Sequence, residues 1–172
     1  MMDDHTDQLA DALHIELGRC ITQWAKVEHH LCILFVVLMR SEDDNRSFWT
    51  FWAVSSFKGK LDMTAAAAHR AFANNPELMS EWNACKNKLG KISLKRNELA
   101  HASISCGKRG IGEERETFAE LIPYGGKNTL PVMAGDVHAL TIKDLKQRLI
   151  GFKIAADRVF CMLARANQYL NQ

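Results

Sequence analysis

The sequence lacks the features that mark a secreted or membrane-spanning protein. Its first residues include the acids Asp3, Asp4 and Asp7 rather than a basic region followed by an apolar run, so no secretory signal is recognisable. The uninterrupted apolar run from Leu31 to Met39 is far shorter than the ~20 residues that cross a bilayer. We therefore expect a cytoplasmic protein that has no membrane partner.

The cysteines and histidines lack the spacings that disulfides and metal sites require. The five cysteines are spread through the chain and include no C-x-x-C pair, which argues against a disulfide framework and against a thiolate metal site. The adjacent His29 and His30 would point apart on a helix, and the histidines elsewhere show no ligand spacing. We therefore expect reduced thiols, no bound metal ion and no cofactor.

A strong excess of charge of either sign is also absent. The 172 residues carry a net charge of +2, which is too small on its own to indicate a nucleic-acid-binding protein. Hydrophobic residues make up 47% of the chain and charged residues 24%, values typical of a globular protein rather than a disordered or fibrous one. The length fits one domain and no repeat or linker divides it, so we predict a single domain over residues 1–172.

Apolar residues at helical spacing are abundant. They recur every three or four positions in long segments, as expected for helices that bury one face. Asn75 before Pro76, and Thr141 three residues before Asp144, supply start signals for two of these helices. The predicted helical regions are about 4–39, 44–74, 76–101 and 141–172, with Gly59 as a candidate bend in the second.

The pattern changes between the third and fourth long helices. Short segments at 103–105, 117–124 and 129–133 have strand-like residues separated by glycines. Gly125 and Gly126 are suited to close a hairpin, and Pro131 favours an edge or irregular conformation for the last segment. The predicted fold class is therefore mainly α: a bundle of four to five helices with a short β-hairpin-like insertion at about 102–140.

The predicted third helix ends in the most informative motif of the chain, Arg96-Asn97-Glu98-Leu99-Ala100-His101. Arg96 occupies a vacant place on the apolar stripe, so its side chain should point inward, where its five donors need acceptors. Glu28 lies on the stripe of the first helix and is the best local candidate to pair with Arg96. The alternative is that Glu28 sits at the edge of that stripe in water.

The motif has the residue types that metal-independent RNA cleavage requires. Asn97 and His101 stack on one helix face at i, i+4, and Arg96 lies beside them. An imidazole exchanges a proton near neutral pH, a guanidinium binds phosphate, and an amide orients either group. Because one histidine cannot act as acid and base at once, a two-fold dimer would have to supply a second copy of His101.

The run from Arg96 to His101 resembles the R-x4-6-H motif of the HEPN superfamily (higher eukaryotes and prokaryotes nucleotide-binding), including a polar residue after the arginine, here Asn97. Proteins of that group are small helical bundles, and many are metal-independent endoribonucleases whose motifs meet across a dimer interface. Toxin and defence roles are frequent among them. The resemblance implies an HEPN-like homodimer whose site contains Arg96, Asn97 and His101, with the segment at 102–140 as a departure from the simplest bundle.

A cluster of lysines precedes the motif. Lys88, Lys91 and Lys95 share one face of the predicted helix, and the run at 86–96 that contains them has no acid. They are candidates to bind an RNA backbone, since phosphate contacts are made mostly by such cations. The alternative is an ordinary solvated face of the helix.

The sequence leaves two functions open. The first is an endoribonuclease that uses Arg96, Asn97 and His101. The second is a non-catalytic helical module that binds a cognate protein or a nucleotide, in which Arg96 only ties the helix to its neighbours and His101 merely ends it. An open groove that holds two motifs would favour the nuclease.

Overall fold

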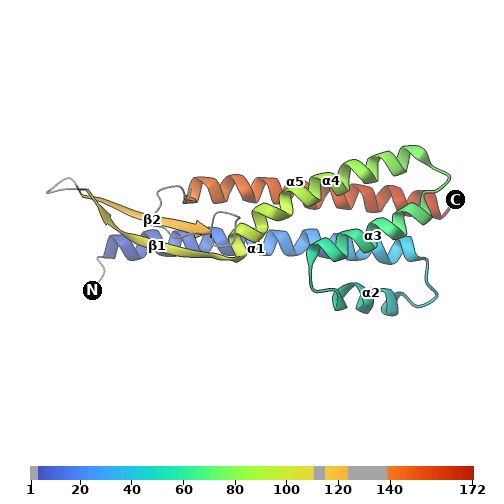
Figure 1. The fold of residues 1–172 in the computed structure, drawn as a ribbon, viewed down its shortest axis with the longest axis horizontal. Coiled ribbons are helices and arrows are strands. Elements are labelled where there is room, and N and C mark those ends of the chain that lie inside the picture. Colours follow the sequence, from blue (N-terminus) through green and yellow to red (C-terminus); the bar gives the residue numbers. More distant parts are fainter. Residues whose placement is uncertain (1–3, 111–114, 124–138) are drawn as a thin grey trace. The chain divides into compact units, whose positions relative to one another are not determined.

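The computed structural model describes residues 4–110, 115–123 and 139–172 (Figure 1). Within these ranges the chain forms five helices and one two-stranded antiparallel sheet, so the prediction of a mainly helical fold with a β insertion is confirmed. None of the described helices is both long enough and apolar enough to cross a membrane. The elements are α1 (Asp4–Met39), α2 (Asp44–Ala53), α3 (Phe57–Ala71), α4 (Pro76–Ala100), β1 (Ala102–Arg109), β2 (Glu116–Pro123) and α5 (Ile142–Leu170).

The chain divides into two compact units. Unit 1 comprises Met1–Thr22 and Leu94–Ile150, and unit 2 comprises Gln23–Ser93 and Gly151–Gln172. The end of α4, the hairpin and the start of α5 therefore belong to unit 1. The second part of α1, all of α2 and α3, and the remainder of α4 and α5 belong to unit 2.

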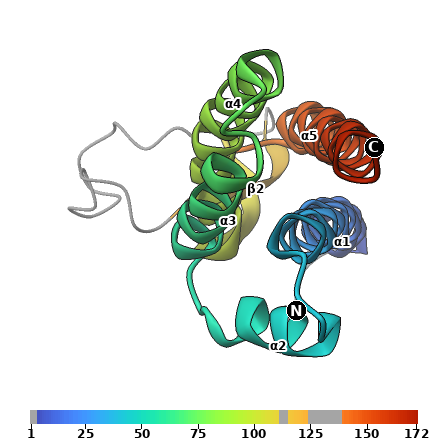
Figure 2. The same cartoon turned by 90° about the vertical axis from the view of Figure 1, so that its right-hand side faces the viewer.

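Unit 2 is a helical bundle with an aromatic centre. Trp24 is almost fully buried, and its ring packs edge-on against Phe57 at 4.7 Å and Phe152 at 5.3 Å between centroids. Helices α1, α3 and α5 thus meet at Trp24. Burial of this large aromatic side chain stabilises the packing of the three helices. Figure 2 shows α2 on the outer side of this bundle, next to α1 and α3.

The second predicted helical region is divided into α2 and α3. The expectation of a bend at Gly59 is wrong, because the helix breaks earlier, between Ala53 and Phe57. Ser56 starts α3 as its N-cap and accepts a hydrogen bond at 3.0 Å from the Gly59 amide. A Cβ at Gly59 would lie 2.8 Å from the Val54 side chain, so this glycine permits a close approach inside the first turn of α3.

Unit 1 contains the β-hairpin. β1 pairs with β2 in antiparallel register from Ala102 opposite Pro123 to Arg109 opposite Glu116, and Gly110 follows β1 with φ 122°. Two of the three predicted strand segments are therefore present. β1 is longer than the predicted segment at 103–105, and β2 begins and ends one residue earlier than the predicted segment at 117–124. The third segment at 129–133 and the predicted Gly125–Gly126 turn lie outside the described residues.

Helix α5 begins as predicted. Asp144 Oδ2 accepts hydrogen bonds from the Thr141 amide at 2.9 Å and from the Thr141 hydroxyl at 2.7 Å. This is a capping box with aspartate in the usual place of glutamate. Leu140 forms an antiparallel bridge to Leu121 of β2, so the residue before the cap is tied to the hairpin.

The cysteines fall into two classes. Cys20, Cys32 and Cys85 are buried, as expected for small core residues, and burial raises the pKa of each thiol to about 11. Cys161 also falls within a helical pattern of the sequence, which predicts a buried core residue, and this prediction is wrong, because Cys161 is exposed on α5. Cys106 is partly exposed.

We therefore expect a thiol reagent such as DTNB, applied to native protein at pH 7.5, to react rapidly with Cys161, and with Cys106 at an intermediate rate. The three buried thiols should react only when the chain unfolds, because their raised pKa values leave little thiolate at this pH and the reagent cannot reach them. Peptide mass mapping after a short exposure measures this. Rapid labelling of Cys85 in the native protein would contradict the packing described here.

Candidate functional site

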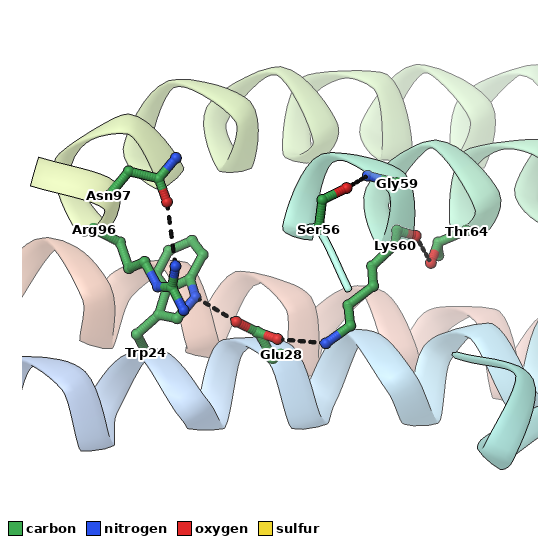
Figure 3. A network of polar contacts seen from close by, with 8 residues as sticks. All are labelled: Trp24, Glu28, Ser56, Gly59, Lys60, Thr64, Arg96 and Asn97. Atoms are coloured by element: carbon green, nitrogen blue, oxygen red, sulfur yellow. Dashed lines mark hydrogen bonds and ion pairs between the residues drawn. The ribbon is translucent and has the colours of Figure 1, made fainter. Parts of the chain in front are cut away.

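The predicted motif lies at the very end of α4, in unit 1. Arg96 is half-buried, whereas Asn97 and His101 are exposed. The Arg96 Nη1 atom donates a hydrogen bond of 3.2 Å to the Asn97 side-chain oxygen, as Figure 3 shows. The His101 amide donates to the Asn97 carbonyl at 3.2 Å. Asn97 therefore contacts the arginine through its side chain and the histidine through its backbone.

The position of His101 follows from the change of secondary structure. α4 ends at Ala100, and β1 begins at Ala102, directly after the histidine. A residue at such a junction is held on both sides while its side chain is left in solvent. The imidazole is thus fixed in sequence between a helix and a strand and is accessible from solvent.

An arginine that the sequence analysis did not select also reaches the motif. Arg148, in the second turn of α5, donates to the Lys95 carbonyl at 2.7 Å and to Glu98 Oε2 at 2.5 Å. A signal for it was present, because Arg148 lies three residues after the buried Leu145 and four before the buried Phe152. An arginine on an apolar face needs acceptors, which is the same reasoning that selected Arg96.

The predicted supporting residue, Glu28, lies in unit 2 within a buried polar network. Its carboxylate accepts a hydrogen bond from Trp24 Nε1 at 2.8 Å and is paired with Lys60 Nζ at 2.8 Å (Figure 3). Only 14% of the Glu28 side chain and 7% of the Lys60 side chain are exposed. Glu28 is therefore a paired, largely buried carboxylate rather than a solvated one, and its pairing with Arg96 stays a prediction.

Lys60 also contacts aromatic rings. Its ammonium group lies 4.2 Å from the centroid of the Trp52 ring and 5.4 Å from that of Phe51. Cation–π attraction adds to the ion pair at such distances, most strongly where water is excluded. Lys60 was not predicted as a site residue, although it falls on the apolar face of α3, between the buried Phe57 and Thr64.

The candidate RNA-backbone lysines are all in water. Lys88, Lys91 and Lys95 are exposed, which leaves their ammonium groups accessible, and their role in RNA binding stays a prediction. In the part of the chain that the structure describes, no group of three histidine, cysteine or acidic residues is arranged to hold a metal ion. The donors at the motif are a guanidinium, an amide and one imidazole, a set suited to anions rather than to cations.

Comparison of the chain with models of known protein families, with curated proteins and with solved structures finds no match. The resemblance to the HEPN superfamily therefore depends on the six residues from Arg96 to His101 and on the helical setting in which they occur. The function has to be inferred from the chemistry of these residues.

Proposed function

We propose that this protein is a metal-independent endoribonuclease of the HEPN type that acts as a homodimer. The observation that carries the proposal is an exposed imidazole, His101, placed one helical turn after the hydrogen-bonded pair of Arg96 and Asn97. An accessible proton-transfer group and an anion-binding group on one turn are the minimal equipment for cleaving a phosphodiester bond without a metal ion.

The proposed reaction is an internal transesterification of RNA. His101 accepts the proton of a ribose 2′-hydroxyl, and the 2′-oxygen attacks the adjacent phosphorus. The bond from phosphorus to the 5′-oxygen then breaks, and that oxygen takes a proton from an imidazolium, which leaves a 2′,3′-cyclic phosphate and a 5′-hydroxyl end. Arg96 stabilises the charge that develops on the non-bridging phosphate oxygens, and Asn97 orients the guanidinium through the contact at 3.2 Å.

The dimer follows from the count of imidazoles. Each chain has one histidine in the motif, and acid and base are needed in the same turnover. A two-fold axis that brings two copies of helix α4 together supplies the second His101. Lys88, Lys91 and Lys95 then serve to hold the RNA backbone on either side of the cleaved bond.

Chelator-treated protein is expected to cleave a single-stranded RNA of mixed sequence and to leave a DNA of the same sequence intact, because DNA lacks the attacking 2′-hydroxyl. Gel analysis of labelled strands in excess EDTA measures this.

An absence of fragments after chelation, when magnesium or manganese restores cleavage, would contradict a metal-independent mechanism. An absence of fragments under all conditions, with protein that is folded and dimeric, would favour the alternative of a non-catalytic helical binding module.

A further inference from the structure

The centre of the motif contains a residue with a partner on another helix. Glu98 follows Asn97 directly, and its carboxylate is paired with Arg148 of α5 at 2.5 Å. The same guanidinium donates to the Lys95 carbonyl at 2.7 Å. The Arg148 side chain thus contacts α4 twice, at the residue just before Arg96 and at the residue just after Asn97.

We propose that Arg148 is a positioning residue that fixes the orientation of the last turn of α4. The inference rests on the proposed function in so far as the turn is taken to be catalytic. Only 12% of the Arg148 side chain is exposed, so its charge is used inside the protein rather than on a substrate. Arg148 therefore acts on the reaction through Asn97 and His101.

The helix end explains why a cation from elsewhere is needed. The C-terminal end of a helix carries partial negative charge, which a nearby cation stabilises. The last four residues of α4, at 97–100, include no basic residue, although Lys95 and Arg96 directly precede them. Arg148 supplies this charge from α5, and its planar guanidinium satisfies a carbonyl and a carboxylate at once, which a lysine cannot do with the same geometry.

The arginine is itself held by a rigid start of α5. Thr141 and Asp144 form the capping box at the beginning of the helix, and Leu140 is bridged to Leu121 of the hairpin. The hairpin in turn begins with Ala102, the residue after His101. The motif is thereby supported on the α4 side by Arg148 and on the other side by β1, and the two supports are connected through Leu121 and Leu140.

The test is the replacement Arg148→Ala, compared with Arg165→Ala as the matched control. Arg165 is also an α5 arginine paired with two α4 carboxylates, those of Glu77 and Glu81, but it lies in unit 2. We expect Arg148→Ala to lower kcat by about 10- to 100-fold with KM nearly unchanged, since small misplacements of catalytic groups have such effects. Arg165→Ala should leave both constants unchanged.

Amide hydrogen exchange provides a readout that does not need activity. Loss of the Arg148 contacts should accelerate exchange of the His101 amide, which donates to the Asn97 carbonyl. Exchange that accelerates in Arg148→Ala but not in Arg165→Ala supports the positioning role even if the wild type cleaves no RNA. In that case only the proposed function would fail.

Two further variants keep the inference falsifiable if Arg148→Ala does not fold. Arg148→Lys retains the charge but not both contacts, so we expect an intermediate kcat. Glu98→Gln retains an acceptor oxygen for the Arg148 guanidinium, and the hydrogen bond still has an ionised donor, so we expect a change of less than about threefold. A rise in KM alone in the arginine variants would show that Arg148 binds substrate instead. Unchanged kcat and unchanged His101 exchange in an active enzyme would overturn the inference.

Discussion

Replacement of His101 by alanine is expected to reduce the rate of RNA cleavage by roughly 10²- to 10⁴-fold, the usual contribution of a positioned general acid or base. The imidazole is exposed at the end of α4 and has no neighbour of the same chemistry in the motif. The loss should appear in kcat, because proton transfer belongs to the chemical step, whereas binding of the RNA backbone depends on other groups. Initial rates at several RNA concentrations separate the two constants.

His69→Ala is the matched control for this prediction. His69 is likewise an exposed histidine near the end of a helix, in the last turn of α3, and it has no role in the proposed site. Its replacement should leave kcat and KM unchanged. Equal activity of His101→Ala and the wild type, or an equal loss in the two alanine variants, would eliminate His101 as the proton-transfer group.

The largest effect on stability is expected from Lys60→Ala. This change leaves the Glu28 carboxylate largely buried without the ammonium group that lies 2.8 Å from it. Removing one partner of a buried ion pair typically lowers the free energy of unfolding by about 3–5 kcal/mol. The contact of Lys60 with the Trp52 ring is lost as well. Urea denaturation, followed by tryptophan fluorescence and circular dichroism, measures the change.

Lys58→Ala provides the comparison. Lys58 lies two residues earlier on α3 and is also paired with a carboxylate, that of Asp62 at 2.5 Å, but 85% of its side chain is exposed. Pairs in solvent contribute little, since water screens the charges. We expect the midpoint of denaturation to be almost unchanged in this variant. Similar losses in Lys58→Ala and Lys60→Ala would refute the burial argument for Lys60.

The long helices were predictable because their signals are local. Periodic apolar residues with clear start signals define α4 and α5: Asn75 caps α4, and Thr141 with Asp144 forms the capping box of α5, as the sequence indicated. The break between α2 and α3 was missed because aromatic residues recur at helical spacing on both sides of it, from Phe48 to Phe57. The break is set by Ser56, whose side chain caps α3. A serine can form such a cap or lie within a continuous helix, and the local sequence does not show which of the two occurs.

The polar partners were less accessible to prediction. Glu98 and Arg148 are 50 residues apart in the chain, and Glu28 and Lys60 are 32 apart. Periodicity shows that a charged residue occupies an apolar face, but it does not show which element faces it. The strands were predicted only in part for a similar reason. Their extent and register depend on which face of the hairpin is buried and on the connection between the strands.

The central claim is that the turn ending in His101 cleaves RNA by attack of the 2′-hydroxyl, and the chemical nature of the product ends tests it most directly. Mass spectrometry of fragments formed by wild-type protein in EDTA should show 2′,3′-cyclic phosphate and 5′-hydroxyl ends, and these fragments should be missing for His101→Ala. Fragments with 5′-phosphate and 3′-hydroxyl ends, or fragments of any kind that persist in His101→Ala, would contradict the account.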